Sequence, residues 1–116
     1  MPEKRESNDI ERYITLRQCI LRTLYEIFKE FPYAPVELSQ IQEECHTNTK
    51  DLNWNIVYLE KCGYIELSKS FPCPPFIASS AVITAKGIDL VENESEFSRR
   101  FSFIKSSDPQ QSSDYS

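Results

Sequence analysis

The sequence predicts a mainly helical fold with a small β hairpin, in the order helix, short extended piece, helix, helix, strand, strand, helix. Leu52, Ile56 and Leu59 have helical spacing, Gly63 then ends the helix, and an alternating, strand-like run follows over residues 64–67. A proline-rich stretch, residues 71–76, interrupts two strand-like runs and so predicts a hairpin tip. At 116 residues the chain is long enough for one domain with a modest core, which we assign to residues 9–97.

The first helix is expected over residues 10–31, after a flexible N-terminal segment 1–8. Asn8 or Asp9 can cap it, because a short polar side chain accepts hydrogen bonds from the free N–H groups of a first turn. Apolar residues line two faces of this helix, namely Leu16, Ile20, Leu24, Ile27 and Phe31 on one and Ile14, Leu21, Tyr25 and Phe28 on the other. So wide a surface predicts either a central core helix or a core helix that also packs against a second subunit.

Prolines 32 and 35 end the first helix and make residues 33–36 an extended connector. A second helix is expected over residues 37–45, with Leu38 and Ile41 inward. After a turn at residues 46–47, Asn48 with Asp51 three residues later, or Thr49 alone, can cap the third helix.

The hairpin is expected to pair residues 64–67 with a returning strand over residues 77–83. Thr84 then caps a fourth helix that ends near Phe97, and Gly87 inside it lowers helix propensity but permits close packing. Residues 98–105 are either a helix extension or a strand that docks on a partner. Residues 106–116 have the composition of a disordered tail.

Charge and hydropathy narrow the classes of function. A formal net charge of −5 argues against a nonspecific polyanion binder, which normally carries a basic excess. Acidic residues concentrate in segments 36–45 and 84–97, whereas charges balance over residues 46–70, where Lys50, Lys61 and Lys69 stand against Asp51, Glu60 and Glu66. No apolar run approaches the roughly 20 residues that span a bilayer, and the charged N-terminus lacks the core of a secretory signal. We therefore expect a cytoplasmic protein with no membrane partner.

The sequence has few residues that could form a metal, catalytic or cofactor site. Cys19, Cys45, Cys62 and Cys73 include no C-x-x-C pair, so we expect reduced thiols and no metal site. The single histidine, His46, is expected to be a solvated or capping residue at a turn. With two glycines, no nucleophile–base pattern and no phosphate-cradling loop, the chain is expected to be neither an enzyme nor a cofactor-binding protein.

Two segments carry a family resemblance. Residues 59–66 (LEKCGYIE) resemble the end of the recognition helix and the first wing strand of winged helix-turn-helix transcription regulators of the MarR and PadR kind. Residues 83–90 (ITAKGIDL) resemble the start of the helix that follows the wing in the same families, and the resemblance extends over residues 16–97. It implies a winged helix-turn-helix that binds DNA as a homodimer, paired through the first helix and the C-terminal helix.

The same resemblance places the DNA-reading residues on the outer face of the third helix, with the hairpin wing on the backbone. A helix fits the major groove, where base edges display distinct donors and acceptors. Asn53 can pair with adenine, whereas Lys50 and Tyr58 can reach phosphates or bases. The predicted DNA-binding residues are Thr49, Lys50, Asn53, Trp54 and Tyr58 on the helix and Lys69 on the wing.

Two features depart from a typical reading helix. The outer face has no arginine, although arginine is the commonest partner of guanine. Trp54 is large and apolar, and it is expected either to contact DNA or to pack against the wing or the second helix. The principal prediction is a small DNA-binding transcription regulator. The alternative is a winged-helix protein–protein interaction module without DNA binding, which the acidic composition and the aromatic hairpin tip favour.

Overall fold

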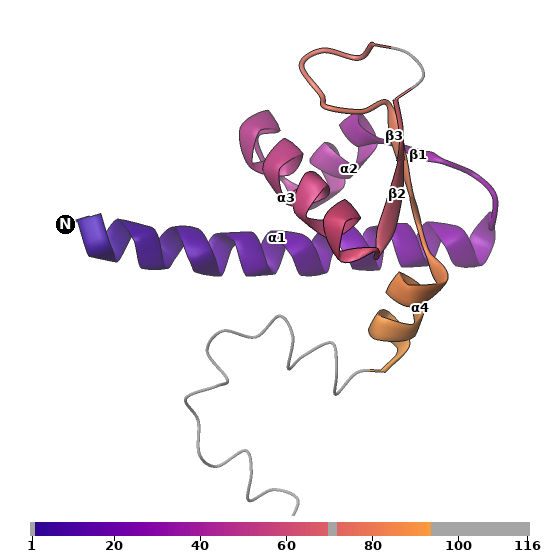
Figure 1. Ribbon diagram of the computed structural model, residues 1–116, viewed down its shortest axis with the longest axis horizontal. Coiled ribbons are helices and arrows are strands. Elements are labelled where there is room, and N and C mark those ends of the chain that lie inside the picture. The colour runs from indigo at the N-terminus through magenta and orange to yellow at the C-terminus, as the bar shows by residue number, and fades with distance from the viewer. Residues whose placement is uncertain (1, 70–71, 94–116) are drawn as a thin grey trace, which may run out of the picture.

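A computed structural model of the chain describes residues 2–69 and 72–93, with side chains described from residue 9 onward. In that part the chain is mainly helical and carries a small antiparallel sheet, as the sequence predicted. The helices are α1 (Pro2–Glu30), α2 (Leu38–Cys45), α3 (Thr49–Cys62) and α4 (Ala85–Glu92), and the strands are β1 (Val36–Glu37), β2 (Ile65–Ser68) and β3 (Ser80–Ile83) (Figure 1).

The sheet has the order β1-β3-β2, and both of its pairings are antiparallel. β3 is the central strand, with Ala81 opposite Val36 of β1 and Ile83 opposite Ile65 of β2. β3 begins at residue 80 and not at residue 77 as predicted. The reason is that the Ile77 N–H donates to a side chain of α3 and not to a strand.

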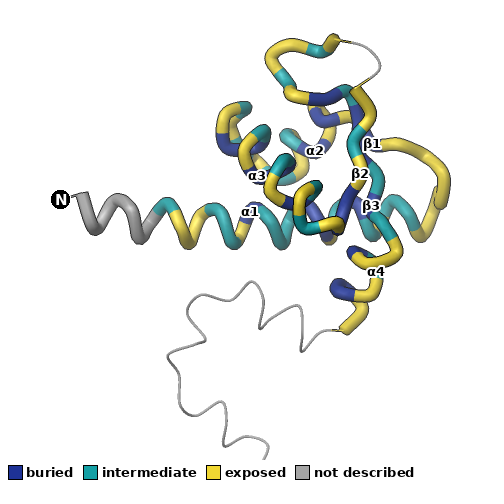
Figure 2. The backbone as a smooth tube through the Cα atoms, viewed as in Figure 1, coloured by how far each residue is buried: buried dark blue, intermediate teal, exposed yellow. Residues whose placement is uncertain are grey.

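The core lies between α1 and the elements packed on it. α2, α3 and the sheet all lie against α1, whose N-terminal end projects beyond them (Figure 1). Figure 2 shows that each of these helices and strands carries buried positions. The largest fully buried hydrophobic side chains there are Ile20, Leu21, Leu24, Leu38, Ile41, Leu52, Ile56, Leu59 and Ile65. The predicted inner face of the third helix is therefore confirmed.

The ends of α1 differ from the prediction. The helix begins at Pro2, so it runs through residues 2–8 and the predicted cap at Asn8 or Asp9 is wrong. Proline suits a first helical turn, because its φ is fixed near the helical value and its missing N–H would have no partner there. At the other end the helix stops at Glu30, which leaves Phe31 in the turn and 62% exposed instead of inward-facing.

α4 begins after Thr84, as predicted, since the Thr84 hydroxyl accepts a hydrogen bond from the Gly87 N–H at 3.1 Å. It ends at Glu92, short of the predicted end near Phe97. Segments 98–105 and 106–116 lie outside the described residues. Among the described residues, no helix combines the length and apolar character needed to cross a membrane.

Cys19 and Cys45 form a disulfide, with their Cα atoms 5.9 Å apart, so the prediction of reduced thiols is wrong for this pair. The bond ties the middle of α1 to the last residue of α2. The two cysteines are 26 residues apart in sequence, and only the packing of α1 against α2 brings them together. Cys62 and Cys73 are free.

Candidate functional site

Hydrogen bonds and a left-handed glycine define both ends of α3. The Asn48 side chain accepts a hydrogen bond from the Asp51 N–H at 2.7 Å, which confirms the predicted cap. At the C-terminal end Gly63 adopts a left-handed conformation (φ 85°) that favours glycine. The Lys86 ammonium donates to the Cys62 carbonyl at 3.2 Å and so satisfies one of the last free carbonyls of the helix.

Two polar side chains on the inner flank of α3 join it to α1. Asp51 and Asn55 are 4% and 0% exposed. Arg12 Nε donates to Asp51 Oδ2 at 3.0 Å, and Arg17 Nε donates to Asn55 Oδ1 at 2.7 Å. The Asn55 amide also donates to the Asp51 carbonyl oxygen at 2.8 Å. These bonds satisfy both buried groups and fix how α3 sits along α1.

The two arginines differ in their electrostatic surroundings. The hydrogen bond from Arg12 to Asp51 raises the pKa of its guanidinium, and the neighbouring Asp9 adds to the effect. Arg17 is partly buried, and desolvation lowers the pKa of its guanidinium. Arg12 thus forms ion pairs with Asp51 and Asp9, whereas the Arg17 guanidinium lies against aromatic rings.

Those rings form an aromatic cluster with Arg17, made of Tyr13, Trp54 and Tyr58. Trp54 stacks on Tyr13 with the ring centroids 5.3 Å apart and the planes at 24°. The Arg17 guanidinium carbon lies 3.9 Å from the Tyr58 centroid and 5.8 Å from that of Trp54. Trp54 thus packs on Tyr13 of α1, a contact that was not predicted, and it is still 56% exposed.

A groove of ≈ 490 Å³ runs along the outer face of α3. Its lining combines apolar side chains with two lysines, namely Lys50, Asn53, Trp54, Val57, Tyr58 and Lys61 of α3 and Ile77 of the hairpin loop. Lys50 and Lys61 form no ion pair within the described part of the chain, and they stand near opposite ends of the helix.

The two carboxylates of α3, Asp51 and Glu60, do not line the groove. Asp51 is buried against α1, and Glu60 lies 3.9 Å from Lys69 of the hairpin. Lys50 and Lys61 are therefore the charged residues that line the groove, and both are cationic. On α3 itself the charges are therefore separated in space: the two lysines line the groove, whereas Asp51 faces α1 and Glu60 lies beside the hairpin.

Of the six predicted DNA-binding residues, four line the groove: Lys50, Asn53, Trp54 and Tyr58. The other two do not. The Thr49 hydroxyl accepts a hydrogen bond from the Gln42 amide of α2 at 3.1 Å, and Lys69 lies on the hairpin beside Glu60.

Asn53 lines the groove but its amide is already engaged. Its Nδ2 donates to the Pro75 carbonyl at 3.0 Å, and its Oδ1 accepts from the Ile77 N–H at 2.9 Å. A paired contact between this amide and adenine would compete with these two bonds. In this structure Asn53 anchors the hairpin loop to α3.

Tyr13 and Arg17 were not predicted from the sequence. Both lie on α1, where the apolar residues around them predicted a core helix, with or without a second subunit packed on it. Their spacing of four residues places them on one face of a helix, which was the available signal, but only the packing of α1 on α3 brings that face to Trp54.

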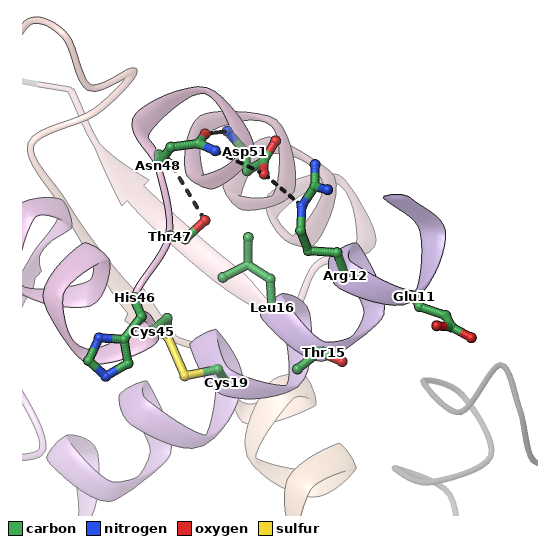
Figure 3. A pocket seen from close by; sticks show the side chains of 10 residues that line it. All are labelled: Glu11, Arg12, Thr15, Leu16, Cys19, Cys45, His46, Thr47, Asn48 and Asp51. Atoms are coloured by element: carbon green, nitrogen blue, oxygen red, sulfur yellow. Dashed lines mark hydrogen bonds and ion pairs between the residues drawn. A yellow bond between two sulfur atoms is a disulfide. The ribbon is translucent and has the colours of Figure 1, made fainter. Parts of the chain in front are cut away.

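A second cavity, of ≈ 550 Å³, lies between α1 and the turn that joins α2 to α3 (Figure 3). The Cys19–Cys45 disulfide forms part of its wall, with Thr15, His46 and Thr47 nearby. Its cation, Arg12, is already paired with Asp51 across the cavity wall. Among the described residues, no group of three or more His, Cys, Asp or Glu side chains gathers in a way that could hold a metal ion.

The chain matches no family model, and the curated proteins include no match to it. Its function therefore has to be inferred from the geometry of α3 and its neighbours.

Proposed function

We propose that the chain is a small winged helix-turn-helix transcription regulator that binds DNA in the cytoplasm. The order of the elements supports this fold, since α2 and α3 precede the β2–β3 hairpin and α4 follows it. The strand order β1-β3-β2 places the hairpin beside the end of α3. In the proposed complex α3 lies in the major groove, which is about 12 Å wide and admits a helix, and the hairpin follows the backbone.

The separation of charge on α3 is the observation that carries this proposal. Lys50 and Lys61 line the groove, and neither is ion-paired to a described residue. They are eleven positions apart, which is about 16 Å along a helix at 1.5 Å per residue. Lysines at this separation can contact phosphates on either side of a groove, while Trp54 and Tyr58 between them offer apolar contact to a thymine methyl.

A homodimer, paired through α1 and the C-terminal helix, would present two copies of α3 to two half-sites. The length of α1 supports this part of the proposal. Its buried residues lie between positions 16 and 24, whereas the helix extends to Pro2 and leaves Ile10 43% exposed. Helical surface beyond what the core uses is available to a second copy.

The test is a titration of labelled mixed-sequence duplex DNA at low salt, followed by fluorescence anisotropy and repeated at increasing salt. Affinity should fall steeply, because bound lysines release counterions from phosphates. The double variant Lys50→Ala, Lys61→Ala should bind more weakly, and its log–log salt slope should be smaller by about 2.

Lys29→Ala is the control for loss of a positive charge away from the groove, because Lys29 is exposed in the last turn of α1; it removes one charge, whereas the double variant removes two. This control should bind as the wild type does. Failure of the folded wild type to bind duplex DNA at low salt, or equal losses in the control and the double variant, would refute the proposal.

One observation favours a second candidate, a winged-helix module for protein–protein contact. The groove on α3 is lined by Trp54, Val57, Tyr58 and Ile77, and exposed aromatic residues are enriched at protein interfaces. For this candidate the wild type binds no DNA at any salt concentration.

A further inference from the structure

We propose that the groove on α3 takes DNA that displays an unpaired, unstacked base, and that this base stacks on Trp54. The inference rests on the proposed DNA-binding function and names the form of DNA that the same site prefers. Three features of the groove lead to it, namely the engagement of its amide side chain, the exposed face of the Trp54 ring, and the position of its cations.

The first feature is that the amide in the groove, the side chain best suited to reading base edges, is already bonded. A protein distinguishes base pairs in a duplex through hydrogen bonds to their edges. The Asn53 amide bonds to the Pro75 carbonyl and the Ile77 N–H. What the groove offers instead is ring faces and aliphatic surface.

The second feature is the open side of Trp54. Tyr13 and Arg17 approach its ring from α1, yet the residue is 56% exposed. Trp54 also lines the groove together with Val57 and Ile77, so part of its exposed surface is open to that groove. A nucleobase can stack on such a ring only after it leaves the base stack of the duplex.

The third feature is a match of size and charge. At ≈ 490 Å³ the groove falls within the range of about 300–1,000 Å³ that is typical of sites for small molecules, so a single base fits. Lys50 and Lys61 line it, and Arg17 stands beside Trp54. A basic groove with exposed aromatic rings is the arrangement that binds unpaired nucleic acid, with phosphates on the cations and bases on the rings.

The experiment uses three DNAs of one sequence: a fully paired duplex, the same duplex with a central bulge of unpaired thymines, and the single strand. Trp54 is the only tryptophan in the chain, so its fluorescence reports directly on stacking. The bulged duplex and the single strand should quench this fluorescence and bind more tightly than the paired duplex.

Trp54→Ala should weaken binding to the bulged duplex by about 5- to 150-fold, measured by anisotropy of labelled DNA, and should weaken binding to the paired duplex by a smaller factor. Trp54→Phe keeps a ring and should retain part of the preference, which keeps the test decisive if the alanine variant fails to fold. Tyr33→Ala is the matched control, because Tyr33 is a 95% exposed aromatic residue outside the groove, and it should change neither affinity.

Two results would overturn the inference, and they differ in what else they imply. If the paired duplex binds with a steep salt dependence but the bulge neither tightens binding nor quenches Trp54, this inference fails and the proposed regulator stands. If none of the three DNAs binds at low salt, both fail together.

Discussion

Replacement of Asn53 should loosen the hairpin loop and lower the stability of the fold. The Asn53 amide makes two hydrogen bonds to the backbone of that loop, at 3.0 Å to the Pro75 carbonyl and at 2.9 Å from the Ile77 N–H. A typical hydrogen bond of this kind contributes about 0.5–1.5 kcal/mol net. The site is partly exposed, so water can replace some of the loss, and Asn53→Ala should lower the free energy of unfolding by about 1–2 kcal/mol.

Urea denaturation measures the global effect, and amide hydrogen exchange at Ile77 measures the local one. Lys50→Ala is the matched control, because Lys50 is exposed in the same groove and should change stability by less than about 0.5 kcal/mol. Asn53→Asp retains the acceptor for the Ile77 N–H but loses the donor to Pro75, so it should retain protection of Ile77 while losing stability.

Unchanged stability together with unchanged exchange at Ile77 in Asn53→Ala would refute this reasoning. That result would show that the amide does not anchor the loop and is available to a ligand. Reduced stability with faster exchange at Ile77 would instead show that any loss of DNA affinity in Asn53 variants includes a loss of loop position.

Three further predictions concern residues that stabilise the fold. Gly87→Ala should lower the melting temperature, because an added Cβ would overlap the Tyr64 carbonyl oxygen. Overpacking costs about 1–3 kcal/mol and so outweighs the helix-propensity gain of about 1 kcal/mol. A stabilised variant would contradict the close packing. Leu59→Ala should cost about 2–5 kcal/mol in urea denaturation, since Leu59 is fully buried, and a near-neutral value would contradict the orientation of α3. The hydrogen bond from Tyr25 to Glu92, at 2.8 Å, raises the pKa of Tyr25 in the folded protein. Its contribution to stability is therefore fully present below about pH 10, the pKa of an unfolded tyrosine, and is lost as the pH rises through the raised pKa of the folded state. Tyr25→Phe should therefore melt below the wild type at about pH 8 and together with it above that folded pKa, and a constant difference across this range would contradict the assignment.

Local rules were sufficient to predict the inner face and the ends of α3. Leu52, Ile56 and Leu59 are fully buried, as their spacing required, and Asn48 caps the helix. These features depend on residues at most four positions apart, or on one residue at a helix end. Sequence patterns report such short-range geometry directly.

The polar bonds between α1 and α3 could not be predicted in the same way. Arg12 and Asp51 are 39 residues apart in sequence, and Arg17 and Asn55 are 38 apart. A buried Asp51 looks in the sequence like any acidic residue in a first helical turn, where it also suits the helix dipole. Its partner becomes visible only when α1 is packed, and the same holds for the disulfide between α1 and α2.

The separation of charge on α3 explains how an acidic chain can present a cationic surface. Lys50 precedes Asp51 and Lys61 follows Glu60, but neighbours in a helix point about 100° apart, so their charges do not cancel on one face. Arg12 of α1 pairs with Asp51, and Lys69 of the hairpin lies beside Glu60, so each acid meets a base from another element. The two outward lysines are thereby left to an anionic partner, although the formal net charge of −5 repels such a partner at long range. Screening confines charge effects to about 10 Å at 0.1 M salt. These lysines should therefore attract DNA phosphates only once the DNA is already close. Binding should therefore depend steeply on salt without the rapid association that a basic protein shows.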